Sequence, residues 1–155
     1  MNFYSSSLVT KILSEKQLNN IQFTLQLLYA DTLDFQESHS LLVSTIVGFG
    51  ELIDIKVRLS KSPKYLRIDP GFLFSLHKNP NFEIIRLQET EALELERINC
   101  NPGDNSINQH QIHIDLKNQE TWMVCGYDPY FVFQNPFLGD DICIKFSSQL
   151  ILAIL

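Results

Sequence analysis

Two histidines and an aspartate between residues 110 and 115 form the densest group of potential metal ligands in the sequence. His110, His113 and Asp115 lie in HQIHID, and two imidazoles with one carboxylate would suit zinc. On a strand, His113 and Asp115 share one face while His110 points to the other. Ile112 and Ile114 alternate with them and are typical of a core-facing side. We therefore interpret His113 and Asp115 as an exposed polar face that could bind a partner, and we expect no bound metal.

Three scattered cysteines, Cys100, Cys125 and Cys143, are the candidate nucleophiles. A thiol activated by His110 or His39 is conceivable, because such a pair is made in space rather than in sequence. However, Cys125 lies in the apolar segment TWMVCGY, where burial keeps a thiol protonated and inert. No serine nucleophile elbow, phosphate-binding loop or metalloprotease motif is present. The sequence therefore favours a protein without catalytic residues and without a cofactor.

An aromatic-rich segment surrounds the single tryptophan. Seven rings lie between residues 122 and 146: Trp122, Tyr127, Tyr130, Phe131, Phe133, Phe137 and Phe146. Packed inside, they would form the main core; partly exposed, they would form a ligand pocket or a protein-binding patch. Tyr127 and Tyr130 flank the Asp128-Pro129 turn, so we expect them to reach the surface. The predicted binding residues are therefore Trp122, Tyr127, Asp128 and Tyr130, together with His113 and Asp115.

This segment resembles an earlier part of the same chain. Residues 51–74 align without a gap on residues 110–133, and both contain Asp-Pro-x-Phe-x-Phe. The alignment suggests an internal duplication of a strand–turn–strand unit, although alternating isoleucines and Asp-Pro turns also arise by chance. Asp69 and Asp128 would then accept backbone N–H groups in equivalent turns, with a catalytic carboxylate pair as the alternative. Lys56 aligns with Asp115, so two similar faces of opposite sign would favour a weak homodimer.

The first third of the chain has a helical pattern. Apolar residues recur at helical spacing between Ser14 and Phe35, and Ser14 with Gln17 has the spacing of a capping box. The residues of this stripe are Leu18, Ile21, Leu25, Leu28 and Tyr29. A second helix is predicted from Glu37 to Phe49, where Gly48 and Gly50 would end it.

From Glu51 the apolar period changes to two, which is typical of strands. Strands are expected at residues 53–60, 65–68, 82–87, 111–116, 121–126, 130–133 and 142–146, and residues 89–98 fit a strand better than a helix. A short helix is predicted from Pro70 to Leu76, an exposed loop from Asn101 to Gln109, and a buried strand or helix turn at the C-terminal LILAIL. We therefore predict one α+β domain over residues 1–155. Its helical N-terminal part (1–50) would pack on a mainly antiparallel sheet formed by residues 51–155.

Composition and charge narrow the function classes. The net charge is −6 and the hydrophobic fraction is 45%, which suits a globular protein and argues against general nucleic-acid binding. No signal-like segment or membrane-length apolar run is seen, and an odd cysteine count without CxxC suggests free thiols in a reducing, cytoplasmic compartment.

The charges are also unevenly distributed along the chain. Residues 51–88 are mildly basic, whereas residues 89–141 are strongly acidic, and acidic surfaces speed docking on basic partners. The leading hypothesis is a non-catalytic protein-binding module, such as an inhibitor or immunity-type partner of a protein with a basic surface. The alternative is a small-molecule-binding protein or small hydrolase with an aromatic-lined pocket near Trp122.

Overall fold

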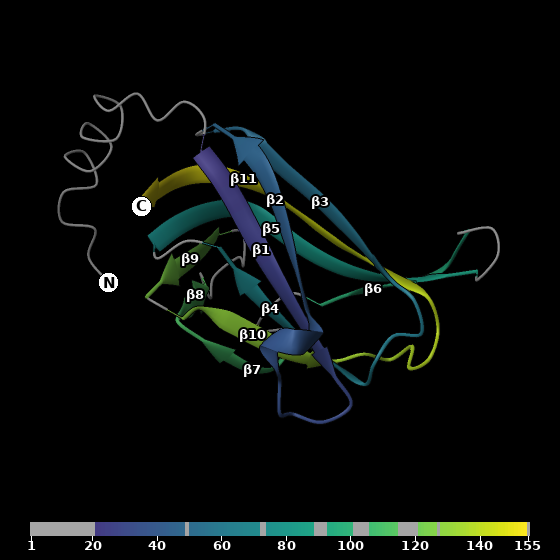
Figure 1. The fold of residues 1–155 in the computed structure, drawn as a ribbon. Coiled ribbons are helices and arrows are strands. Elements are labelled where there is room, and N and C mark those ends of the chain that lie inside the picture. The colour runs from purple at the N-terminus through teal and green to yellow at the C-terminus, as the bar shows by residue number, and fades with distance from the viewer. Residues whose placement is uncertain are drawn as a thin grey trace.

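A computed structural model describes most of the chain beyond residue 20, namely residues 21–48, 50–71, 74–88, 93–100, 106–114, 121–126 and 128–154. Within these residues the fold consists of β-strands arranged in two antiparallel sheets. The single helical element described is a 3₁₀ turn, η1 (Glu37–His39). Figure 1 shows the two sheets as layers, with β1 and β2 passing across β11 and β5.

The first sheet, sheet A, has five strands in the order β2-β1-β4-β10-β7. Their bounds are β2 (Ser40–Val47), β1 (Ile21–Ala30), β4 (Tyr65–Pro70), β10 (Tyr130–Gln134) and β7 (Ser106–His110). The second sheet, sheet B, has the order β3-β11-β5-β9-β8, and β6 pairs with β5 as well. Their bounds are β3 (Leu52–Leu59), β11 (Ile142–Ile154), β5 (Phe74–Leu87), β9 (Thr121–Cys125), β8 (Ile112–Ile114) and β6 (Glu94–Asn99).

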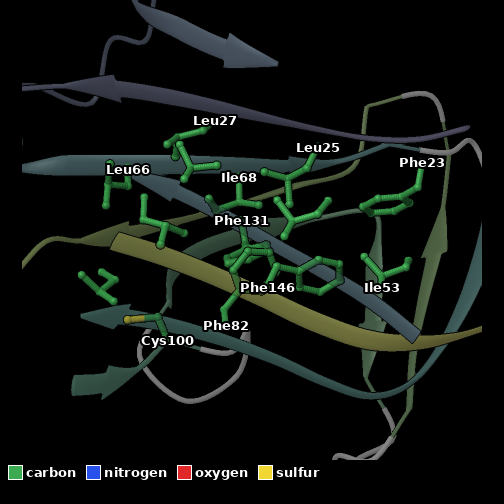
Figure 2. Packing of buried hydrophobic residues seen from close by; sticks show 14 of the residues in the cluster. Phe23, Leu25, Leu27, Ile53, Leu66, Ile68, Phe82, Cys100, Phe131 and Phe146 are labelled. Carbon is green, nitrogen blue, oxygen red and sulfur yellow. The ribbon is translucent and has the colours of Figure 1, made fainter. Parts of the chain in front are cut away.

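The core lies between the two sheets and is built from inward-facing residues of strands of both (Figure 2). Phe82 of β5 is its hub: its ring centroid lies 4.5 Å from that of Phe146 on β11 and 4.8 Å from that of Phe131 on β10. Phe23 of β1 stacks on Phe146 at 5.8 Å. These contacts join the sheets face to face, as in a β-sandwich, where alternate residues of both inner faces interdigitate.

The prediction of N-terminal helices, and with it the α+β class, is wrong for residues 21–50. In β1, Phe23, Leu25 and Leu27 are buried while Gln22 is exposed and Thr24 is half-buried. The helical stripe included Leu25 but omitted Phe23 and Leu27, the residues that reveal a period of two. A strand buries all of these apolar side chains, and β-branched and aromatic residues also lose rotamer freedom in helices.

The second predicted helix is wrong for a similar reason. Residues 40–47 form β2, and four of the eight residues are β-branched, a composition that favours strands: Val43, Thr45, Ile46 and Val47. Residues 14–20, where the first helix was predicted to begin, lie outside the described residues. The proposed helical part therefore contributes two strands of sheet A in the region that the structure describes.

Two further predictions are corrected around Pro70 and Asn101. Pro70 is the last residue of β4 and Phe74 is the first of β5, so a helix from Pro70 to Leu76 does not form. The loop predicted over residues 101–109 contains β7 from Ser106, while residues 101–105 lie outside the described part. In contrast, strands are confirmed at the positions predicted for β3, β4, β9 and β10, and at 94–98.

Strand β5 is longer than predicted because Asn79-Pro80 does not end it. Asn79 has a positive φ of 51°, and the register with β11 shifts between Ser147 and Gln149, opposite this site. Before the irregularity β5 pairs with β9, and after it with β6. The dipeptide thus marks the point at which one strand changes partners, which is a common role of bulges.

The internal duplication is also overturned. Asp69 and Pro70 lie within β4, whereas Asp128 and Pro129 lie in the connection between β9 and β10. The first segment contributes β3 to sheet B and β4 to sheet A without a β3–β4 pairing, while β8 and β9 of the second segment form an antiparallel pair. The two Asp-Pro dipeptides therefore take different secondary structure, and the strands that flank them are paired differently. Shared strand composition and a common dipeptide account for the resemblance.

Gly71, directly after β4, allows a close approach to β1. A Cβ atom at this position would overlap the backbone carbonyl of Thr24. We expect Gly71→Ala to lower the free energy of unfolding by about 3–4 kcal/mol, because backbone would have to shift. Gly139 is the matched control: its φ is +83° but nothing lies within 4 Å of an added Cβ, so Gly139→Ala should cost about 1–2 kcal/mol. Equal losses in urea unfolding would contradict the steric explanation.

Candidate functional site

Trp122 is part of the core rather than of a surface site. Its side chain is 1% exposed, and its ring stacks on Phe82 at 5.8 Å. Phe131, Phe133, Phe137 and Phe146 are also buried. Most of the aromatic cluster is thus explained by packing between the sheets, and Trp122, which was predicted as a binding residue, is enclosed in the core.

Asp128 and Tyr130, in contrast, meet on the outer face of sheet A. They are brought together there by Arg67, which β4 directs away from the core. Arg67 Nε and Nη2 donate to the two carboxylate oxygens of Asp69 at 2.8 and 2.9 Å, and Nη2 also donates to Asp128 Oδ1 at 3.1 Å. Its guanidinium carbon lies 4.0 Å from the ring centroid of Tyr130. One arginine therefore joins three side chains from β4, the β9–β10 connection and β10.

The other side of Tyr130 is occupied by His110. The two residues are register partners on β10 and β7, and their rings stack at 5.2 Å with an interplanar angle of 27°. His110 Nδ1 lies 2.9 Å from the backbone oxygen of Asp128, and the Asp128 N–H donates to Gln111 Oε1 at 2.7 Å. We call Arg67, Asp69, Asp128, Tyr130 and His110 the Arg67 cluster.

A hollow of about 240 Å³ adjoins the Arg67 cluster. Its floor is formed by side chains of sheet A, and the connection between β1 and β2 contributes Leu33 and Phe35. The same connection carries Glu37, whose Oε2 accepts a hydrogen bond from Gln26 Nε2 on β1 at 2.6 Å. Apolar and acidic groups of one loop therefore lie beside the cluster.

Carboxylates outnumber cations on this face. In the described residues, Asp69 and Asp128 flank the guanidinium of Arg67, and the charge of Glu37 acts on Asp69. Asp128 is 63% exposed, while Asp69 is only 19% exposed. Burial raises the pKa of Asp69, while hydrogen bonding and charge from Arg67 act in the opposite direction. Asp69 thus fixes the position of Arg67, and Asp128 presents its carboxylate to solvent. The arrangement suits recognition of a cationic group by a preorganised acidic surface.

A larger hollow, of about 430 Å³, lies on the other side of the β1–β2 connection. Tyr29 and His39 from sheet A and η1 line it, together with Asp31, Asp34 and Lys61. The rings of Tyr29 and His39 meet edge to face at 5.9 Å. Its volume is within the range of small-molecule sites, but it contains none of the residues predicted from the aromatic cluster.

The structure also places the cysteines and the candidate metal ligands of the described part of the chain. All three cysteines are free, and burial raises the pKa of Cys100 to about 12. No group of three or more His, Cys, Asp or Glu residues that could hold a metal occurs in the described ranges. Asp115, Tyr127 and the side chain of His113 lie outside them, so the predicted absence of zinc stays a prediction.

One signal for this site is present in the sequence, although it belongs to no recognised motif. Arg67 and Asp69 are separated by one residue on a strand, which places both on one face and within reach of each other. Asp69 was predicted as a turn residue or as half of a catalytic carboxylate pair, and Arg67 as one of the cations of a basic region. Their partners Asp128 and His110 come from distant segments, so the complete cluster depends on the pairing of β4, β10 and β7.

Searches against protein-family models, curated proteins and solved structures gave no match to this chain. In the described residues, no helix is long and apolar enough to cross a membrane. Inferences about function therefore rest on the geometry of the surface.

Proposed function

We propose that the chain is a non-catalytic protein-binding module that recognises a basic surface of another protein through the outer face of sheet A. The observation that carries this proposal is the Arg67 cluster: an exposed Asp128 carboxylate held by a guanidinium that is itself fixed by Asp69 and stacked on Tyr130. An inhibitor or immunity-type partner would use such a surface to cover a cationic site.

Four physical features support the proposal. The cluster is preorganised, so little side-chain entropy is lost when a partner docks. Tyrosine and arginine are enriched at the centres of protein interfaces. The excess of carboxylates over cations accelerates association with a basic partner and disfavours acidic ones. Leu33 and Phe35 supply apolar area beside the charges, which exposed ion pairs need because they contribute only about 0–1 kcal/mol each.

The proposal predicts that charge reversal on this face abolishes partner capture. Immobilised protein with Asp128→Lys should lose a specific basic partner that the unmodified chain retains from an extract of its native host. Asp54→Lys is the matched control, because Asp54 is an exposed carboxylate on β3 of the other sheet and the charge change is the same. Capture by the unmodified protein should also weaken at high salt, where charges are screened.

Thermal unfolding of both variants checks that each remains folded. Equal loss of the captured protein in Asp128→Lys and Asp54→Lys, or capture that does not change with salt, would contradict docking through the Arg67 cluster.

A second candidate function is small-molecule binding. The observation that favours it is the 430 Å³ hollow with Tyr29 and His39 in its wall, since an aromatic ring and a histidine are common in ligand sites. This hollow replaces the pocket expected near Trp122, whose ring is enclosed in the core. Protein binding is the preferred function because the Arg67 cluster is the more extensively preorganised of the two surfaces.

A further inference from the structure

Strand β2 lies at one edge of sheet A and has a neighbour on one side only in the described part of the chain. Its eight residues, SLLVSTIV, contain no charge, no proline and no glycine. They pair with β1 in continuous register from Ser40 to Val47 without an irregularity. Figure 1 shows β2 beside β1 with no strand of sheet A beyond it. A long, regular and uncharged edge is a template for pairing with another strand.

The other edge strands of the described sheets have features that discourage such pairing. Strand β3 carries Asp54, Lys56 and Arg58, and β6 carries Glu94, Glu96 and Arg97. Strands β7 and β8 are short, with five and three residues. Charged or short edges are the usual protection against edge-to-edge association. Strand β2 has neither kind of protection.

The outward side chains of β2 are apolar and exposed. Leu42 is 69% exposed and Ile46 is 65% exposed, and both lie on the outer face on either side of Ser44. Exposed apolar side chains of this size along an open edge are typical of an interaction surface. The edge therefore offers both unpaired backbone groups and apolar side chains to an incoming strand.

The residue pattern of β2 is symmetric about Ser44. In an antiparallel pair of two β2 strands with Ser44 opposite Ser44, Leu42 of one copy meets Ile46 of the other on the outer face. On the inner face, Leu41 meets Val47 and Val43 meets Thr45. Apolar residues thus face apolar residues in both layers, apart from Thr45 opposite Val43, and the absence of charge means that no like charges meet. Cross-strand pairs of this kind are the unit of sheet stabilisation.

We propose that β2 is a self-association edge, through which two copies of this chain pair antiparallel about a two-fold axis at Ser44. The two copies of sheet A then form one continuous sheet of twice the width. A dimer formed in this way is closed, because each β2 edge is used once. Both Arg67 clusters lie on the same side of the joined sheet, so the dimer presents two acidic docking surfaces to one side.

Size-exclusion chromatography with light scattering tests the proposal. The unmodified protein should approach twice the mass of the 17.9 kDa chain as its concentration rises. Ser44→Lys places two ammonium groups opposite each other at the axis, and it should weaken association at least about tenfold. Thr24→Lys is the matched control: Thr24 is the cross-strand neighbour of Ser44 on β1, and their hydroxyls are 2.9 Å apart. Thr24→Lys adds the same charge to the same face of sheet A, but on β1 rather than on the edge strand β2. It should therefore leave association unchanged.

A mixture of Ser44→Lys with Ser44→Glu should restore the dimer, since the opposite charges then meet at the axis. In the proposed register Ser44→Cys also cross-links to itself under mild oxidation, because paired Cα atoms of adjacent strands lie within disulfide range. Ile46→Cys cross-links to Leu42→Cys rather than to itself.

A monomer at every concentration, a dimer that survives Ser44→Lys, or equal weakening by Thr24→Lys would overturn the proposal. Thermal unfolding of each variant distinguishes loss of the dimer from loss of the fold. Failure of the Asp128→Lys capture experiment would leave this result untouched, because β2 and the Arg67 cluster use different strands of sheet A.

Discussion

Replacing Phe82 by alanine is expected to lower the free energy of unfolding by about 3–5 kcal/mol, the largest effect of any substitution considered for this fold. Phe82 is fully buried on β5. Its ring contacts Phe146 from the neighbouring strand, Trp122 from β9 and Phe131 from the opposite sheet. Truncation would leave a cavity at the point where both sheets meet. Small domains are stable by only about 5–15 kcal/mol, so this loss is a large part of the total.

Phe74 provides the control for this prediction on the same strand. Its side chain is 41% exposed, so Phe74→Ala removes the same atoms with a smaller loss of buried area and no enclosed cavity, and it should cost about 1–2 kcal/mol. Urea unfolding of both variants, followed by tryptophan fluorescence, measures the difference. Similar costs for the two substitutions would mean that the sandwich core is not organised around Phe82.

The second large effect is a loss of folding stability at acidic pH, which we expect from the protonation of His77. This histidine is fully buried between the sheets. Its Nδ1 lies 2.9 Å from Ser148 Oγ, and its Nε2 lies 3.0 Å from Ser75 Oγ. Its ring packs against Phe23 and Phe146. Burial lowers the pKa of His77 to about 4, because the imidazolium would lose its hydration without gaining a counter-charge.

The sign of the pH dependence follows from proton linkage. Between about pH 6.5 and pH 4 the unfolded chain binds a proton at residue 77 that the folded chain does not bind, so stability falls as the pH falls. The stabilising effect of a neutral His77 is complete above the unfolded pKa of about 6.5. It is lost on approaching pH 4, and the loss amounts to about 3 kcal/mol.

Chemical unfolding at a series of pH values measures this loss. His77→Gln removes the titrating group and keeps a neutral polar side chain, so the variant should lack the part of the pH dependence that belongs to His77. The carboxylates are the same in the unmodified protein and in His77→Gln. Their contribution therefore cancels when one curve of unfolding free energy against pH is subtracted from the other. A difference that stays constant between pH 7 and pH 4 would show that His77 does not titrate in the unfolded and folded states as the structure implies.

Strand predictions succeeded where the spacing of apolar residues fits only a strand, and they failed where the spacing also fits a helix. In the β3 region the alternation of Ile53, Ile55 and Val57 has a single interpretation, and the strand formed as predicted. In residues 21–30 the apolar residues fit both periods, because Leu25 and Leu28 belong to a helical stripe while Phe23, Leu25 and Leu27 belong to a strand face. The opposite sheet can bury Phe23, Leu25 and Leu27 together, and only this tertiary contact selects the strand over the helix.

In the candidate site, too, some features followed from the sequence and others only from the structure. Tyr127 and Tyr130 were predicted to reach the surface beside the Asp-Pro turn. Tyr130 is half-buried on the outer face of sheet A next to the exposed Asp128, whereas Tyr127 lies outside the described residues. For Trp122 both a core and a binding position were open, because the number of rings in one segment does not reveal how many face the second sheet; the structure encloses its ring in the core. Asp69 and Asp128 were paired through a repeat that does not exist, whereas the structure pairs them through Arg67.

By itself, the sequence determined the strands in which apolar and polar residues alternate strictly. It also determined that no recognisable catalytic motif is present and that the segment forming β2 has no charged residue. These properties depend only on residue type and spacing. The tertiary structure decided the all-β class, the enclosure of Trp122 and the assembly of Arg67, Asp69, Asp128, Tyr130 and His110. The reason is that strand pairing is non-local: β4, β7 and β10 are adjacent in sheet A although they are far apart in the chain. Contacts of that kind leave no short-range pattern, so only the folded sheet brings their side chains together.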